Sequence, residues 1–294
     1  MMQRRTWWWV LGGLGALALL FLLGVYSVLT LARGGGPALG SAVGLLRLEG
    51  TIVSAEDFVE QVEAARKDRG IKAVVLRVES PGGSVGASQE IYAALQRLAA
   101  AKPLVASFGN VAASGGYYAG IAAQYVFALP GTITASIGVR MSHLDASEFL
   151  QLLHLKPDIL KSGQFKDVGA MHRPMRAEER ALLEDLLRAM HVQFKAAVAA
   201  RRGLTAEQVD AIADGRVVTG EAAVQAKLVD AVGDLHDAVV KAGELAGLGP
   251  EPRVIDLDED RPWLLRVLLG ERRATWQAWG RLLSQPMIGY YWAP

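Results

Sequence analysis

Apolar runs of strand length alternate with helical patterns through the middle of this 294-residue chain. Ile71–Val78 and Leu104–Phe108 have the length and apolar content of buried strands, whereas Glu56–Lys67 and Ala87–Ala101 repeat apolar side chains at helical spacing. Strands that alternate with helices in this way form parallel βαβ units joined by right-handed crossovers. The alternation therefore predicts an α/β fold built on a parallel sheet.

The same patterns predict further elements on either side. Strands are expected at Val43–Leu48, at Tyr125–Leu129 and, as a short piece, at Asp158–Lys161. Helices are expected from Ser114 to Ala123, and at Ala146–Leu155, Ala177–Arg201, Ala206–Ala213, Gly220–Ala226 and Leu235–Ala246. The helix at Ala177–Arg201 is the clearest, because apolar side chains recur in it at every fourth position, at 182, 186, 190, 194 and 198.

The N-terminal segment predicts a membrane anchor. No charged residue occurs from Thr6 to Ala32, and the apolar run exceeds both the roughly 20 residues that span a bilayer and the ~7–15 residues of a cleavable signal-peptide core. Arg4 and Arg5 precede the run, so the N-terminus is expected in the cytoplasm and the rest of the chain outside. The alternative is a long signal peptide cleaved near Gly34.

Composition shifts divide the chain into four parts. Residues 1–33 hold the cytoplasmic stub and the predicted transmembrane helix, and residues 34–41 form a glycine-rich linker. Residues 42–248 carry the alternating pattern and are expected to form the folded domain. Residues 249–294 form an amphipathic and aromatic tail, which is expected to pack on the core or a neighbour, touch the membrane, or occupy the protein's own cleft.

Composition also excludes several classes of function. A net charge of +1 leaves no electrostatic footprint for nucleic acid. The absence of cysteine excludes disulfides and thiolate metal sites. None of the five histidines lies in a recognisable triad or metal motif. We therefore expect no nucleic-acid partner, no metal and no cofactor.

Ser114 is the candidate nucleophile. It follows a predicted buried strand and begins a segment of small and aromatic residues, so it is expected to be exposed at a strand-to-helix turn. Free N–H groups and the positive end of the helix dipole gather at such a turn, which suits a group that carries negative charge in a transition state. The alternative is that Ser114 only caps the helix, as serines there commonly do.

A serine nucleophile needs a base and donors for an oxyanion. A lysine serves as the base if burial lowers its pKa from ~10.4 to about 7–8. Lys166 lies beside Phe165 in a glycine-containing loop, although its local sequence fits a solvated charge equally well. The segment Ser80–Gly83 joins a strand to a helix, and its N–H groups could point into a pocket; the alternative is an ordinary turn.

Four motifs, in this order and spacing, resemble the signal peptide peptidase A family in its short, single-domain form. They are Ser80-Pro81-Gly82-Gly83, Ala112-Ala113-Ser114-Gly115-Gly116-Tyr117-Tyr118, Ser136-Ile137-Gly138-Val139 and Lys161-Ser162-Gly163-Gln164-Phe165-Lys166-Asp167. The segments Ala213–Val217 and Lys227–Asp230 are also similar, and the match runs from Val43 to about Leu248. The resemblance implies a Clp-protease/crotonase-like fold of repeated ββα units behind one N-terminal transmembrane helix.

The resemblance also implies the roles of the site residues. Ser114 would be the nucleophile and Lys166 the general base, and Ser136 would hydrogen-bond the lysine amine. The backbone N–H groups of Gly83 and Gly115 would bind the oxyanion. Family members form ring-like oligomers at the membrane, and in the short form neighbouring subunits supply the serine and the lysine. Glu79 departs from the Asn or Asp that the family more often carries, a change that could alter the pocket wall.

These expectations predict a membrane-anchored serine endopeptidase with a Ser/Lys dyad. Its substrates would be residual signal peptides and other membrane-proximal polypeptides. One alternative is a related protease that cleaves a specific partner, such as a stomatin-type protein. Another is a catalytically silent scaffold at the membrane, against which the joint presence of Ser114, Ser136 and Lys166 argues.

Overall fold

The computed structural model describes residues 40–257 and 288–291, together with residues 17, 19–21 and 23–24. Most of the predicted anchor and linker, and most of the tail, lie outside the described residues. Those of the anchor that are described are helical, and their apolar side chains are exposed. In this described part of the chain no helix is both long and apolar enough to cross a membrane.

Six parallel strands form the centre of the fold and confirm the predicted α/β architecture. Their order across the sheet is β10-β1-β2-β4-β5-β9. The strands are β1 (Ala42–Glu49), β2 (Ile71–Ser80), β4 (Leu104–Ala113), β5 (Tyr125–Ala128), β9 (Ala231–Val232) and β10 (Val254–Asp256).

Two additions at the carboxyl ends of the central strands make the architecture mixed. β6 (Ile133–Ala135) pairs in parallel with the end of β4, and β8 (Val217–Thr219) pairs antiparallel with β6. A separate antiparallel sheet places β11 (Ile288–Tyr291) between β3 (Gly82–Ser84) and β7 (Arg140–Met141). The last described piece of the tail therefore lies along the glycine motif that follows β2.

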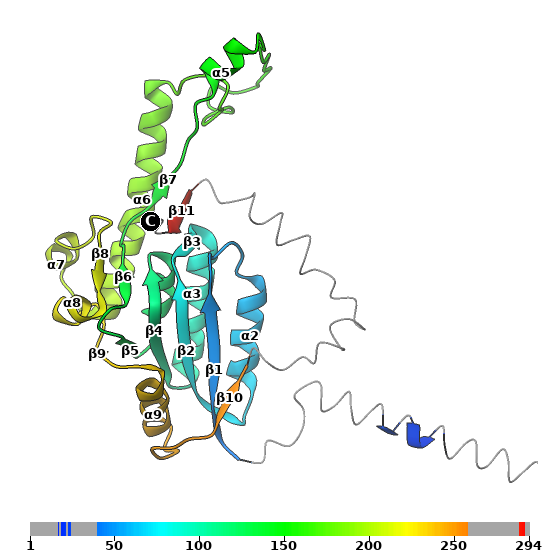
Figure 1. The fold of residues 1–294 in the computed structure, drawn as a ribbon, viewed down its shortest axis with the longest axis vertical. Coiled ribbons are helices and arrows are strands. Elements are labelled where there is room, and N and C mark those ends of the chain that lie inside the picture. Colours follow the sequence, from blue (N-terminus) through cyan, green and yellow to red (C-terminus); the bar gives the residue numbers. More distant parts are fainter. Residues whose placement is uncertain (1–16, 18, 22, 25–39, 258–287, 292–294) are drawn as a thin grey trace, which may run out of the picture.

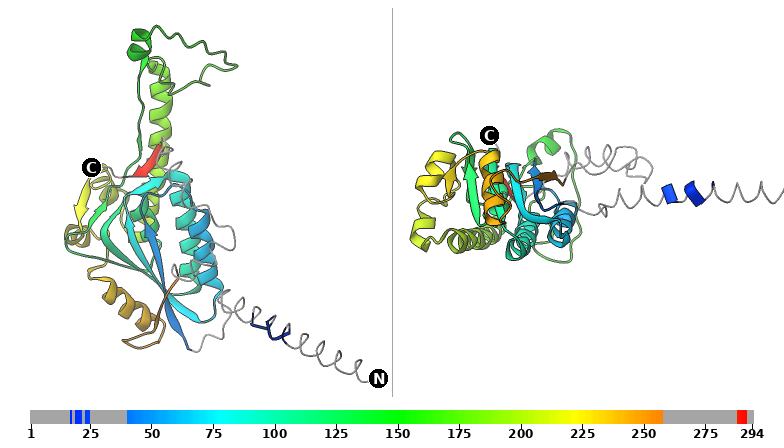
Figure 2. Two further views of the ribbon diagram at one scale, coloured as in Figure 1. Left: turned by 45° about the vertical axis from the view of Figure 1, so that its right-hand side comes forward. Right: turned by 90° about the horizontal axis from the view of Figure 1, so that it is seen from below.

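Helices cover both faces of the central sheet (Figures 1 and 2). On one face, α2 (Glu56–Lys67) and α3 (Val85–Ala101) pack on alternate residues of the strands, including Leu46 and Leu76. On the other face, α9 (Leu235–Leu245) packs on the intervening residues, including Val43. This alternation is the period-two pattern of a strand buried on both sides. Ile91, Leu95 and Leu98 of α3 are buried, as the helical spacing predicted.

The long helix α6 (Ala177–Arg202) leaves the body of the molecule. Figure 1 shows it rising beyond the sheet, with α5 (Ser147–Leu152) at its far end. Phe194 and Val198 are buried against the core, but Leu182 and Leu186 are exposed, so only the C-terminal part of the apolar stripe packs. We call residues 142–190 the arm.

The structure corrects three of the predicted elements. Residues 158–161 are irregular rather than a strand, since no described strand lies beside them to complete a ladder. The helix after Ser114, α4, spans only Gly115–Gly120 and does not reach Ala123. α7 (Ala206–Asp210) is also shorter than predicted, whereas α8 (Gly220–Gln225) agrees closely with its prediction.

Candidate active site

Ser114 lies in a strained turn between β4 and α4. Its backbone has φ 53° and ψ −114°, a conformation that a residue with a side chain adopts only at a cost of order 1–3 kcal/mol. It occupies the N-cap position of α4, yet its side chain makes no capping hydrogen bond. The interpretation of Ser114 as a simple helix cap is therefore wrong. The expectation that Ser114 is exposed is also wrong, because the residue is buried, at 1% exposure.

Ser136 lies beside Ser114, directly after the neighbouring strand β6. Ala113 of β4 and Ala135 of β6 are paired in register, so each serine is the next residue after a paired position. The Ser114 N–H donates to the Ala135 carbonyl at 2.8 Å, and Ser136 has a φ of 52° that matches the φ of Ser114. Adjacent strands lie about 4.8 Å apart, so the fold brings these two predicted site residues together.

The Ser80–Gly83 segment is held by its own serine. The Ser80 hydroxyl donates to the Gly50 carbonyl at 2.6 Å and accepts from the Gly82 N–H at 3.1 Å. Gly82 has a φ of 97°, which favours glycine. A Cβ on Gly83 would lie 2.0 Å from the Ile52 carbonyl oxygen, so only glycine fits there. Position 82 thus requires glycine for its backbone conformation, and position 83 requires it because a Cβ does not fit.

The two glycine motifs contact each other. A Cβ on Gly116 would lie 2.6 Å from the Ser80 carbonyl oxygen. Gly115 is the first residue of α4 and is buried. Since Ser80 pairs with Ala112 across β2 and β4, the strand ends that carry Gly83 and Gly115 lie next to each other. Four of the five predicted site residues (Ser114, Ser136, Gly83 and Gly115) therefore meet at one end of the sheet.

Lys166 lies elsewhere, in the arm. It is exposed, its N–H donates to the Gly163 carbonyl at 3.2 Å, and within the described residues its side chain makes no hydrogen bond or ion pair to Ser114 or Ser136.

The loop of Lys166 is tied to Glu179 near the start of α6, whereas His191 of α6 contacts the Ile137 carbonyl beside Ser136 at 3.2 Å. Twelve helical residues separate Glu179 from His191, a rise of about 18 Å. The fold of one subunit does not bring lysine and serine together.

The segment Asp214–Arg216 supports Ser136, a role that sequence reasoning did not assign. The Ser136 hydroxyl donates to the Gly215 carbonyl at 3.3 Å, and the Ser136 N–H donates to the Arg216 carbonyl at 3.0 Å. The Arg216 guanidinium binds Asp214 and lowers the pKa of that carboxyl to about 2. The motif Ala213–Val217 was the available signal, but its contact with Ser136 depends on β6 pairing with β8.

Glu79 takes part in a polar cluster at the end of the sheet. Its carboxylate accepts from Arg77 at 2.6 Å and from the Asn110 N–H at 2.8 Å. Glu79 also lines a cleft of about 370 Å³ on the α9 face, with Arg47, Glu49, Arg77, Leu129, Asp234, Leu235 and His236. Glu79 thus holds the β4 end that precedes Ser114.

Among the described residues, no group of three or more histidine or acidic side chains could hold a metal ion.

Two family models match the chain. The model for peptidase family S49 matches residues 96–249, more than half of the chain, and the Clp protease model matches residues 46–137. The second match covers β1 to β6 and agrees with the observed order of central strands. The fold is a Clp protease-like α/β fold with a mixed sheet.

Several relatives of the chain are proteases by name. A Synechocystis sp. protein to which protease activity is ascribed is 39% identical over 69% of this chain and 74% of its own length. "Protease 4" of Salmonella typhi is 38% identical over 74% of this chain, and "Serine protease SPPA, chloroplastic" of Arabidopsis thaliana is 31% identical over 82%. The chain spans only 35% and 36% of the length of these last two. On these matches the chain belongs to peptidase family S49 and is a serine peptidase of the signal peptide peptidase A family.

Proposed function

We propose that the chain is a membrane-anchored serine endopeptidase whose nucleophile is Ser114 and whose general base is Lys166. The observation that carries the proposal is the position of Ser114 and Ser136, which directly follow the paired residues Ala113 and Ala135. Each serine lies in a strained turn beside the contacting motifs of Gly83 and Gly115. Strain of this kind persists at sites where geometry serves a reaction. A fold that needed only a helix cap at position 114 would not require it.

The proposed reaction is acyl transfer in two steps. Neutral Lys166 takes the Ser114 hydroxyl proton while the serine oxygen attacks the peptide carbonyl carbon, and the N–H groups of Gly83 and Gly115 bind the resulting oxyanion. The lysine then gives its proton to the leaving amine, and the acyl-enzyme remains. Water, deprotonated by the same lysine, releases the acid and restores Ser114. Each oxyanion donor contributes ~2.7–4 kcal/mol in comparable enzymes.

We propose that Lys166 reaches Ser114 across a subunit interface. Lys166 is exposed in the arm, and its loop is tied to Glu179, which lies about 18 Å along α6 from His191 and its contact with Ile137. This position supports the arrangement. The arm also carries exposed apolar side chains, such as Leu160 and Phe165, that suit burial against a second copy. A ring of copies with one repeated heterologous interface would complete every site.

The proposed substrates are residual signal peptides and other membrane-proximal polypeptides. An extended peptide would pair with the backbone of Gly82–Ser84, as β11 does. In this binding mode main-chain hydrogen bonds supply affinity, and pockets for side chains supply specificity. The anchor is supported by the apolar run before Ala32 and by the exposed, helical state of Leu17 and Phe21. In this arrangement the catalytic domain faces the extracytoplasmic side.

Mixing two inactive variants tests the proposal. Ser114→Ala and Lys166→Ala, each purified as the full chain in detergent, should both lose peptide hydrolysis. Subunits exchanged between the two should regain about a quarter of wild-type activity, because a heterologous interface then unites an intact serine with a neighbour's intact lysine at a fraction of the sites. Lys156→Ala is a matched control, since Lys156 is also an exposed lysine of the arm.

Each result of the mixing experiment has a different meaning for the mechanism. Full activity of either single variant would remove that residue from the mechanism. Two inactive variants whose mixture stays inactive, despite proven subunit exchange, would place both groups within one subunit. Loss of activity in Lys156→Ala would mean that the arm tolerates no lysine change, and the result for Lys166 would then carry no mechanistic weight.

A further inference from the structure

We propose that Glu179 is a positioning residue, which through Arg173 and Arg176 fixes the loop that presents Lys166. The inference rests on the proposed function, since it takes Lys166 as the base. Glu179 itself lies in the first turn of α6 and touches neither serine of the site. Its role would be to determine where the lysine of one subunit stands relative to Ser114.

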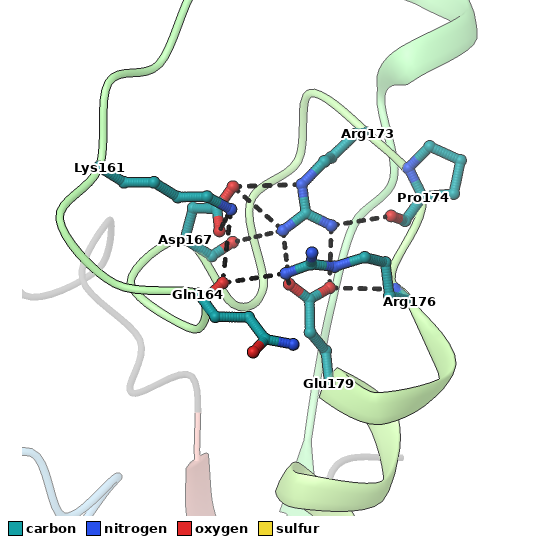
Figure 3. Close-up of polar contacts among 7 residues, drawn as sticks. All are labelled: Lys161, Gln164, Asp167, Arg173, Pro174, Arg176 and Glu179. Atoms are coloured by element: carbon teal, nitrogen blue, oxygen red, sulfur yellow. Dashed lines mark hydrogen bonds and ion pairs between the residues drawn. The ribbon is translucent and has the colours of Figure 1, made fainter.

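Glu179 accepts hydrogen bonds from two arginines (Figure 3). Arg173 binds it in bidentate fashion, with Nη1–Oε2 at 2.8 Å and Nη2–Oε1 at 2.6 Å. Arg176 adds Nη2–Oε1 at 2.6 Å and its backbone N–H to Oε2 at 3.0 Å. Paired N–H donors of this kind fix orientation as well as distance.

The network reaches both sides of the Lys166 loop. Arg173 Nε donates to Asp167 Oδ2 at 3.2 Å, and Lys161 Nζ donates to Asp167 Oδ1 at 2.6 Å. Arg176 Nη2 also donates to the Gln164 carbonyl at 2.9 Å. The loop is thus bound at 161, 164 and 167 (Figure 3). Lys166 is the residue directly before Asp167.

No apolar core could hold this loop in place. Between residues 148 and 193, Glu179 is the one buried residue, at 1% exposure. Leu160, by contrast, is 93% exposed. Burying a carboxylate is unfavourable unless it is paired and hydrogen-bonded, and here two guanidinium groups satisfy it. Within one subunit, the conformation of the loop therefore depends on ionic contacts rather than on packing.

The charge states agree with this geometry. Hydrogen bonds from Arg173, and then from Arg176, hold the pKa of Glu179 well below its usual range. The same contact with Glu179, followed by that with Asp167, raises the pKa of Arg173. The Lys161 and Arg173 contacts lower the pKa of Asp167. Glu179, Asp167 and Arg173 are therefore all ionised at neutral pH.

Glu179→Gln tests the inference, with Asp185→Asn as the matched control. Both changes remove one carboxylate from α6, but Asp185 is exposed and its ion pair is with exposed Arg188. With the full chain in detergent, we expect Glu179→Gln to keep its assembly state and to lower kcat by roughly 10- to 100-fold, the loss that a small misplacement causes. KM should change little, and amide hydrogen exchange should rise in residues 161–174. Asp185→Asn should match the wild type in all of these.

The results for these variants separate the positioning role of Glu179 from the proposed role of Lys166 as the base. Unchanged kcat in Glu179→Gln, with Lys166→Ala inactive, would overturn the positioning role and leave the proposed function intact. Full activity of Lys166→Ala would overturn both. If Glu179→Gln fails to assemble, Arg173→Lys replaces it, because it keeps the charge and loses the bidentate geometry. A wild-type kcat in an assembled Arg173→Lys would overturn the inference, and a reduced kcat with unchanged KM would support it.

Discussion

The N–H of Ser114 donates to the carbonyl of Ala135, the residue directly before Ser136, at 2.8 Å. Because Ala113 and Ala135 are paired in register, the two serines leave neighbouring parallel strands at the same level. Both have a φ just above 50°. A substitution in either turn should therefore alter the conformation of the other turn, and the two hydroxyls should act on the same reacting centre.

Ser136→Ala should lower kcat by roughly 10- to 100-fold. The Ser136 hydroxyl would accept a hydrogen bond from the Lys166 amine, which becomes charged as it takes the Ser114 proton, and a hydrogen bond to a charged group is worth ~1.5–3 kcal/mol. The measurement is steady-state peptide hydrolysis by the assembled protein, with thermal unfolding recorded alongside. Thr134→Val is the matched control, since Thr134 has a buried hydroxyl on the same strand that donates to the Ala112 carbonyl at 2.7 Å. It should reduce stability modestly and leave kcat near the wild-type value.

A structural role alone for Ser136 would give a different result. Its hydroxyl donates to the Gly215 carbonyl at 3.3 Å, and loss of that bond costs ~0.5–1.5 kcal/mol of unfolding free energy. If Ser136→Ala loses only stability, by as much as Thr134→Val, and keeps its kcat, then Ser136 does not act on the base.

Gly83→Ala should abolish activity and lower the unfolding free energy by ~1–3 kcal/mol, the usual cost of overpacking. The added Cβ would lie 2.0 Å from the backbone carbonyl oxygen of Ile52, so the backbone of β3, which carries the Gly83 N–H, must shift relative to Ile52. Gly86→Ala is the control. Its Cβ meets nothing within 4 Å in α3, so alanine should keep activity and stabilise the helix by up to about 1 kcal/mol. An active Gly83→Ala would exclude this backbone from the oxyanion site.

The central sheet could be predicted because its signals are local. Ile71–Val78 and Leu104–Phe108 are largely apolar segments of strand length, and the structure confirms them as β2 and β4, with most of their residues buried. The motif residues at the strand ends follow from the parallel order of these strands. The close contact of Gly116 with Ser80 is a consequence of that order.

The arm could not be predicted, because its determinants are not local. Apolar side chains recur at every fourth position from 182 to 198, yet Leu182 and Leu186 are exposed, whereas Phe194 and Val198 are buried. Burial of Glu179 likewise depends on two arginines whose approach is a tertiary event. The strained backbone of Ser114 arises from β4, β6 and α4 together and has no sequence signature of its own.

Removing the residues after Gly280 should lower KM for extended peptides and leave kcat little changed. The described tail strand Ile288–Tyr291 pairs along Gly82–Ser84, where an added substrate strand would bind. A synthetic peptide of residues 287–294 should then inhibit the truncated protein competitively. The same peptide with Gly289→Pro should inhibit weakly, since proline lacks a ladder N–H. Unchanged KM with intact assembly would show that the tail does not compete with substrate.

Acid should loosen the arm before the body of the protein, because the network of Glu179 and Asp167 depends on ionised carboxylates. Both groups have folded pKa values below their ordinary values of 4.5 and 3.8. The unfolded arm therefore binds protons at a higher pH than the folded arm. The stabilisation is complete above the ordinary values and is lost as the pH falls through the lower, folded values.

Hydrogen-exchange protection factors, corrected for the intrinsic pH dependence of exchange, should therefore fall in residues 161–174 below pH 4.5 while β2 and β4 stay protected. Glu179→Gln should show weak protection of this loop already at neutral pH and a much flatter pH dependence. Asp185→Asn should follow the wild-type curve, because its exposed pair with Arg188 is solvated. If wild type and Glu179→Gln lose protection over the same pH range, the ionised Glu179 carboxylate is not what holds the loop, and Asp167 with Lys161 must do so instead.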